Sequence, residues 1–211
     1  MSTTPVILVL PGGGYAHHAE HEGEPVAEWL RTLGWRARVV EYPVLTRHPG
    51  PLEHVQREIA AERAAGASVV GVLGFSAGGH LAGHSALAGE HRADFAVLCY
   101  PVVSMLLPTH KGSRENLLGR RAWWGTRRSV SLERLVTPGS PPMFLWHTVE
   151  DEAVPVEHSY LMAAALAKAG VPHDLHVFEQ GVHGIGFGDG LPAARWRELC
   201  AAWLRLRAQP S

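Results

Sequence analysis

The chain has 211 residues, of which 46% are hydrophobic and 18% are charged, and its formal net charge is −1. A chain of this length fits one globular domain, 1–211, because it can bury roughly 70% of the surface of its unfolded state. The near-neutral charge provides no overall field that would attract nucleic acid, and favours a small-molecule substrate.

The first predicted element is a buried strand at 6–10, which a run of three glycines follows after Pro11. Its five apolar residues fall far short of the about 20 that cross a membrane, and no basic leader precedes them, so we expect a cytoplasmic protein that binds no membrane. Consecutive glycines allow the amides of Gly13 and Gly14 to point inward as donors to an oxyanion. The alternatives are a flexible turn and a phosphate loop, although the Lys and Ser/Thr of a phosphate loop do not follow.

A cluster of histidines and acids comes next, with His17 and His21 four residues apart and Glu20, Glu22 and Glu24 nearby. These residue types can bind a metal ion, but the segment lacks the HExxH pattern. We therefore expect no metal site here, and predict that His21 and Glu22 begin a helix.

The rest of the chain alternates between two kinds of segment. Apolar runs that are continuous, as in strands covered on both faces, occur at 36–42, 69–75, 95–100, 143–146 and 175–178. Segments with helical periodicity occur at 25–33, 52–65, 79–88, 156–169 and 193–207. The alternation predicts an α/β fold with a doubly wound, mostly parallel sheet, whose ligand crevice lies beyond the carboxyl ends of the strands.

Ser76 lies between a predicted strand and a predicted helix, with Gly74 and Gly78 on either side. A GxSxG pattern in this position is typical of a serine nucleophile on a strained turn, with the amide of the next residue, Ala77, as an oxyanion donor. Glycines two residues before and after remove Cβ atoms that would collide there. The spacing does not match the GxGxxG of a dinucleotide-binding turn.

The histidines and cysteines on the predicted elements have structural interpretations. His80 and His84 are one turn apart on the helix after Ser76, a spacing that permits a metal pair but is more typical of packing. Cys99 and Cys200 fall in a strand and a helix, which argues against a disulfide framework.

Residues 102–142 interrupt the alternation, since they contain no clear strand and are rich in Arg, Gly, Ser and Trp. A segment of this length is usually functional or mobile. Either it covers the site as a partial lid, or it is a surface excursion with short helices such as 131–136.

A serine nucleophile needs a general base and an acid that orients the base. His183, in a glycine-flanked loop after the last predicted strand, is the candidate base, and Glu150, Asp151 and Glu152 follow the strand at 143–146. The order Ser, acid, His is that of α/β hydrolases. His147, at the end of that strand, is expected to orient the following loop.

Several segments together resemble one branch of the α/β hydrolases, the acetyl-xylan-esterase-like and feruloyl-esterase-type carbohydrate esterases. They are "LPGGGYAHHAEHEGEPVAEWLRTLGWRARVVEY", "GVLGFSAGGHLAG", "DFAVLCYPVVSM", "THKGSRENLLG", "PPMFLWHTVEDEAVPVEHS" and "AGVPHDLHVFEQGVHGIG". The resemblance is collinear over nearly the whole chain, although the sequence starts close to the oxyanion strand, which implies a fold trimmed at its N-terminus.

By position, the resemblance implies Ser76 as nucleophile, Asp151 as acid, His183 as base and Gly13 and Gly14 in the oxyanion hole. The acid of related loops lies four residues after the strand-ending His and three before the Val, which selects Asp151 over Glu150 and Glu152, and Asp174 belongs to the remote end of a strand.

The resemblance also implies hydrolysis of short acyl esters, often acetyl groups on sugars, without a cofactor. The alternatives are a catalytically silent binding protein with this fold, and an amide or peptide hydrolase with the same triad. The sequence does not indicate an oligomeric state.

Overall fold

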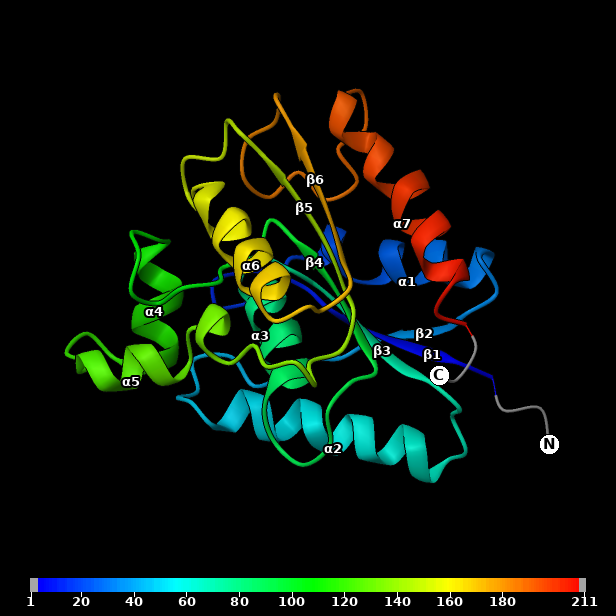
Figure 1. Cartoon of the computed structure of the whole chain (residues 1–211), viewed down its shortest axis with the longest axis horizontal. Coiled ribbons are helices and arrows are strands. Elements are labelled where there is room, and N and C mark those ends of the chain that lie inside the picture. The colour runs from blue at the N-terminus through cyan, green and yellow to red at the C-terminus, as the bar shows by residue number, and fades with distance from the viewer. Residues whose placement is uncertain (1–3, 209–211) are drawn as a thin grey trace.

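The computed structural model describes residues 4–208. Six strands within this range form one parallel sheet (Figure 1). The order across the sheet is β2-β1-β3-β4-β5-β6, and all five pairings are parallel. Because β2 lies on one side of β1, and β3, β4, β5 and β6 follow one another on its other side, the sheet is doubly wound, as predicted. The strands are β1 (Val6–Leu10), β2 (Arg36–Val39), β3 (Val70–Phe75), β4 (Phe95–Cys99), β5 (Met143–Thr148) and β6 (His173–Phe178).

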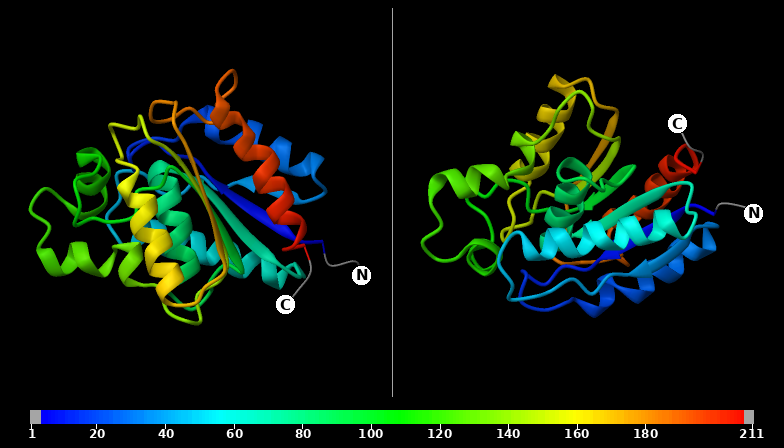
Figure 2. Two further views of the ribbon diagram at one scale, coloured as in Figure 1. Left: turned by 45° about the horizontal axis from the view of Figure 1, so that its top comes forward. Right: turned by 90° about the horizontal axis from the view of Figure 1, so that it is seen from below.

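Helices cover both faces of the sheet (Figures 1 and 2). The apolar side chains of α2, α3 and α6 belong to one buried cluster, and those of α1 and α7 belong to the other. The helices on the sheet are α1 (Glu24–Thr32), α2 (Gly50–Ala64), α3 (Ser76–Leu87), α6 (Glu157–Lys168) and α7 (Trp196–Arg205).

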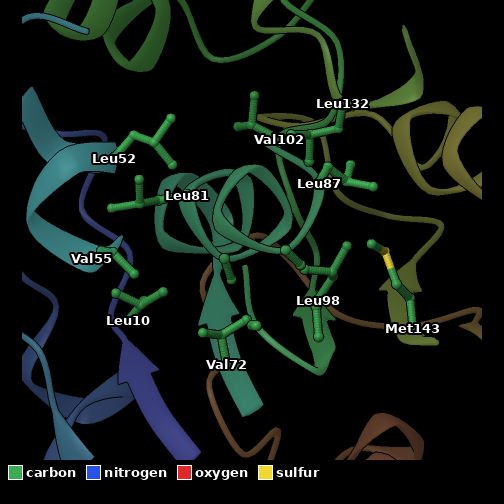
Figure 3. Close-up of a cluster of buried hydrophobic side chains, with 14 of the residues drawn as sticks. Leu10, Leu52, Val55, Val72, Leu81, Leu87, Leu98, Val102, Leu132 and Met143 are labelled. Atoms are coloured by element: carbon green, nitrogen blue, oxygen red, sulfur yellow. The ribbon is translucent and has the colours of Figure 1, made fainter. Parts of the chain in front are cut away.

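The burial of the strands explains their composition. Every residue of β1, β3, β4 and β5 is buried, whereas the edge strands β2 and β6 are partly exposed. Around α3, leucine and valine side chains from α2, α3 and the facing strands interdigitate (Figure 3). A strand that is covered on both faces has no solvent side, so its apolar run is continuous.

The excursion contains helices and no strand, as the sequence indicates. It holds α4 (Lys111–Leu118), α5 (Trp124–Ser129) and the 3₁₀ turn η2 (Leu132–Arg134), which lies within the short helix predicted at 131–136. The element boundaries differ elsewhere by a few residues. The helix predicted from 79 begins at Ser76, and a 3₁₀ turn (Pro192–Arg195) precedes α7.

The topology brings one set of loops together. The loops after β1, β3, β5 and β6 all leave from the carboxyl edge of a parallel sheet, and they carry Gly13, Ser76, Asp151 and His183 in that order. Within residues 4–208, no helix is both long enough and apolar enough to cross a membrane.

Candidate active site

Ser76 occupies a strained turn between β3 and α3. Its φ is +52°, a value that non-glycine residues rarely adopt. A Cβ on Gly74 would lie 2.2 Å from the carbonyl oxygen of Gly78, and a Cβ on Gly78 would lie 2.1 Å from that of Leu10. The first glycine therefore lets strand and helix meet, and the second lets the helix approach β1.

The structure brings Ser76, His183 and Asp151 into one chain of hydrogen bonds. Ser76 Oγ lies 2.8 Å from His183 Nε2, and His183 Nδ1 lies 2.6 Å from Asp151 Oδ2. Because a carboxylate can only accept, Nδ1 carries the hydrogen and Nε2 is free to accept from the serine hydroxyl. The arrangement is that of a nucleophile, a general base and an orienting acid.

Four hydrogen bonds hold the buried carboxylate of Asp151. Oδ1 accepts from the amides of Ala153 (3.0 Å) and Val154 (2.8 Å), and Oδ2 accepts from His183 and from Nε2 of His147 (3.2 Å). Burial alone would raise the pKa of this carboxyl, but the bonds from the two imidazoles outweigh burial and hold its pKa below the usual range. Asp151 is therefore ionised at neutral pH.

His147 is buried and orients the loop that follows it, as the sequence predicts. Its Nε2–H points to the carbonyl oxygen of Val154 (2.9 Å) as well as to Asp151, and its Nδ1 lies 2.8 Å from Ser159 Oγ. It thus holds both the loop and the carboxylate within it.

The other acids near this loop do not reach His183. Glu150 accepts the amide hydrogen of Gly181 at 2.9 Å, so it braces the loop that carries the histidine, and Glu152 is exposed. Asp174 lies at the amino end of β6, 3.9 Å from His176.

The glycine run after β1 forms a turn beside Ser76. Gly13 and Gly14 have φ values of +117° and +67°, and a Cβ on Gly13 would lie 2.2 Å from the carbonyl oxygen of His17. Within residues 4–208 the amides of Gly13 and Gly14 make no hydrogen bond. The amide of Ala77 is in the first turn of α3, where helices leave their amides unpaired.

Glu22 is a buried acid that links the glycine turn to the histidine loop. Its Oε2 accepts from the amide of Gly12 (2.8 Å) and its Oε1 accepts from the hydroxyl of Tyr100 (2.5 Å). Tyr100 in turn accepts from the amide of Gly186 (2.9 Å), and its ring lies 5.2 Å from that of His183. The expected helix start at His21 and Glu22 is a 3₁₀ turn, with α1 beginning at Glu24.

Ser76, His183, Glu22 and the glycine turn line a cavity of about 290 Å³. Two of its lining residues, His110 and Asn116, come from the excursion and were not predicted. Asn116 donates to the carbonyl oxygen of Gly14 (2.9 Å), and burial, with the nearby His183, lowers the pKa of His110. The polar side chains in the lining are His17, His21, Glu22, Ser76, His110, Asn116 and His183.

Three sets of histidine and cysteine side chains lie outside the hydrogen-bonded chain of Ser76, His183 and Asp151. His80 and His84 are buried on α3, in line with the packing interpretation, and Cys99 and Cys200 are buried free thiols. His21 donates to the carbonyl oxygen of Gly184 at 2.9 Å. Among residues 4–208, no three His, Cys, Asp or Glu side chains are grouped so that they could hold a metal ion.

Comparison with known proteins identifies the family. The model of the prolyl oligopeptidase family matches residues 52–208. The chain is 35% identical over 203 residues to endo-1,4-beta-xylanase B of Butyrivibrio fibrisolvens, and 31% identical over 202 residues to an acetylxylan esterase of Xylanibacter ruminicola. These matches cover 85% and 86% of this chain, but only 32% and 41% of the two relatives, so the chain spans well under half of their length.

A solved structure is similar over nearly the whole chain. It is that of an acetyl ester-xyloside bifunctional hydrolase from Caldicellulosiruptor lactoaceticus, with a TM-score of 0.92 and 41% sequence identity. The match covers 98% of this chain and 84% of the other. The chain therefore belongs to the prolyl oligopeptidase family, as an α/β hydrolase similar to acetylxylan esterases.

Proposed function

We propose that this protein is a serine esterase that removes short acyl groups, acetyl above all, from hydroxyl groups such as those of sugars. The observation that carries the proposal is the Ser76–His183–Asp151 chain of hydrogen bonds, which opens on a cavity. The amides of Gly13 and Gly14 line this cavity and have no hydrogen-bond partner within residues 4–208. The similarity to an acetylxylan esterase and to an acetyl ester hydrolase supports the acyl group and the sugar.

In this mechanism Ser76 Oγ attacks the ester carbonyl while His183 Nε2 takes its proton. His183 then protonates the leaving alcohol, and water repeats the sequence on the acyl-enzyme. Asp151 keeps Nδ1 protonated and stabilises the imidazolium that forms, and the amides of Gly13, Gly14 and Ala77 donate to the oxyanion. None of these steps requires a cofactor.

The cavity is of a size that supports a small acyl group on a single sugar unit. Its volume of about 290 Å³ is at the lower end of the range of ligand sites, and imidazole and carboxamide groups around it can bond to hydroxyl groups of the alcohol. Residues 102–142 contribute one wall, through His110 and Asn116, within what we propose to be a single catalytic domain, 1–211.

Active-site labelling tests the proposal. A fluorophosphonate probe should label the protein at Ser76, and the protein should hydrolyse p-nitrophenyl acetate. A folded protein that does neither would instead be a binding protein with a silent hydrolase fold.

The family match supports amide hydrolysis as a second candidate, since the family is that of prolyl oligopeptidases. The same triad can hydrolyse an ester bond or an amide bond, so the geometry does not separate the two activities. Paired acetyl esters and acetyl anilides with the same p-nitrophenyl ring separate the two. We expect the ester to be at least 10³-fold better in kcat/KM, and a preference for the anilide would favour a peptidase.

A further inference from the structure

The excursion presents a surface that the chemistry of the triad does not use. We define the basic–aromatic surface as the five exposed residues Arg120, Arg121, Trp123, Trp124 and Arg128, on α5 and the turn before it. Residues 111–129 contain six Lys or Arg and one acid, Glu115, in a chain whose formal net charge is −1. Positive charge is therefore concentrated on this segment.

Most of this charge has no acidic partner. Arg120 lies 3.4 Å from Glu115, but among residues 4–208 no carboxylate oxygen lies within 4 Å of the guanidinium nitrogens of Arg121 or Arg128. Arg128 instead lies over the ring of Trp124, 5.7 Å from its centre. Guanidinium groups without an internal acid are free to bind an external anion.

The two tryptophans are unusually exposed for their size. Trp123 is 75% exposed and Trp124 is 60% exposed, and α5 has no buried residue. A Cβ on Gly125 would lie 2.1 Å from the ring of Trp123, so that indole rests against the glycine. Each ring thus contacts one neighbour, Gly125 or Arg128, while much of it remains open to a partner.

The surface lies at one end of the molecule, on the excursion that also contributes residues to the lining of the catalytic cavity. All the views show α4 and α5 projecting from the sheet, with α7 on the other side in Figure 1 (Figures 1 and 2). His110 and Asn116, at the start and within α4, line the cavity that contains Ser76. A long molecule bound along this segment can therefore reach the cavity.

We propose that the basic–aromatic surface binds the chain of an acidic polysaccharide, one built of sugar rings that carry carboxylates, and so positions esters of that polymer at Ser76. The apolar C–H face of a sugar ring stacks on an indole, and a carboxylate accepts two parallel hydrogen bonds from a guanidinium. The proposal rests on the proposed esterase function for the role of the bound chain.

Two other anionic partners fit the surface less well. An interfacial membrane helix needs a broad apolar face, whereas α5 has six residues and a single apolar side chain, Trp124. Single-stranded nucleic acid can stack on tryptophan and pair with arginine, but the neighbouring cavity is that of a hydrolase similar to carbohydrate esterases.

The test measures binding apart from catalysis. Electrophoretic retardation in gels that contain polygalacturonate should be strong for the Ser76→Ala protein at low salt, and much weaker in gels with dextran, a neutral polymer. Added salt should weaken the retardation, because exposed charges are screened. Adding Trp123→Ala with Trp124→Ala, or Arg121→Glu with Arg128→Glu, should lower the affinity at least tenfold.

A matched variant controls for charge alone. Arg57→Glu with Arg205→Glu changes the net charge by as much as Arg121→Glu with Arg128→Glu, at exposed arginines of α2 and α7, and should leave binding within twofold of the parent protein. Equal loss in this variant would overturn the proposal, as would equal retardation by dextran. Binding to phosphatidylglycerol vesicles or to oligo(dT) without binding to polygalacturonate would also overturn it.

Failure of this proposal is distinguishable from failure of the esterase function. In the active protein, the surface variants should keep kcat/KM for p-nitrophenyl acetate within twofold, because none of the changed residues lines the cavity. They should lose at least fivefold in kcat/KM on acetylated polygalacturonate. Loss of activity on both substrates would place the variants' effect in the catalytic machinery and overturn the separate role of the surface.

Discussion

The buried carboxylate of Glu22 accepts a hydrogen bond of 2.5 Å from the hydroxyl of Tyr100. The two residues are 78 positions apart in the chain, and together they connect the amide of Gly12, in the glycine turn, with that of Gly186, in the loop that carries His183. The glycine turn and the loop that carries the proposed general base are thus held against a common carboxylate.

Glu22→Gln should lower kcat about tenfold. Gly12 and Tyr100 donate to different oxygens of Glu22, and a carboxamide has an NH₂ group in place of one of them, so one of the two bonds is lost. A hydrogen bond to a charged group contributes about 1.5–3 kcal/mol. Tyr100→Phe should lower kcat to a similar or smaller extent. Steady-state kinetics on p-nitrophenyl acetate measure both, with the exposed Glu24→Gln as control. A fall in thermal stability with unchanged kcat at 25 °C would show a purely structural role.

Ser76→Ala should lower kcat by about 10³-fold or more while the protein stays folded, because the remaining rate comes from binding and the oxyanion donors alone. Alanine tolerates the positive φ of this position no worse than serine does, so the urea unfolding midpoint should change little. Ser129→Ala, on the exposed α5, is the matched control. Near-normal turnover in Ser76→Ala would remove Ser76 from the mechanism.

Asp151→Asn should lower kcat at least about 10²-fold, because an amide facing Nδ1 favours the wrong imidazole tautomer. Glu150→Gln and Glu152→Gln should each change kcat less than about tenfold. Glu150 only accepts the Gly181 amide, which a carboxamide oxygen also does, and Glu152 is exposed. If Glu150→Gln or Glu152→Gln lost most of its activity while Asp151→Asn stayed active, that glutamate and not Asp151 would be the acid of the triad.

Acetyl and propionyl esters should exceed octanoyl esters at least about tenfold in kcat/KM. Among the residues that line the cavity, alanines are the only ones with aliphatic side chains. Each methylene buried in an apolar slot contributes about 0.8 kcal/mol, and the lining provides no such slot. A p-nitrophenyl ester series from C2 to C8 measures this, and a steady rise to C8 would show a deep acyl site.

The stability of the fold should decrease below about pH 6.5, partly through His80. Its Nε2–H donates to the carbonyl oxygen of Val130 and its Nδ1 accepts from the hydroxyl of Tyr15, each at 2.7 Å. Burial lowers its pKa from the ordinary 6.5 to about 4. Between these values the unfolded chain binds a proton that the folded protein does not, so the free energy of unfolding falls as the pH falls.

From pH 7.5 to pH 5, His80 should account for about 2 kcal/mol of this loss. Urea unfolding at the two pH values measures it, and His80→Gln should show a correspondingly smaller loss, whatever its absolute stability. His91→Gln changes an exposed histidine and should behave as the unaltered protein does. An unchanged pH dependence in His80→Gln would contradict the assignment.

The positions of the strands and their parallel direction were predictable because their physical cause is local. Continuous apolar runs at β1, β3, β4 and β5 indicate strands covered on both faces, and the helices between them require parallel pairing. The turn at Ser76 was also predictable, because Gly74 and Gly78 mark where strand, helix and β1 approach each other too closely for a Cβ. Such patterns are properties of short segments, so they can be interpreted without knowledge of the fold.

Only the tertiary structure shows which residues that are far apart in the chain come into contact. Glu22 reads as a helix start in the sequence, and its role depends on the burial of Tyr100 beside it. His110 and Asn116 belong to a segment with no regular pattern, and only packing places them at the cavity. The resemblance had already selected Asp151, and the structure adds the physical reason, because amides that bind Oδ1 of Asp151 turn Oδ2 toward the imidazole of His183. These contacts follow from how loops pack on the finished sheet, which no single segment encodes.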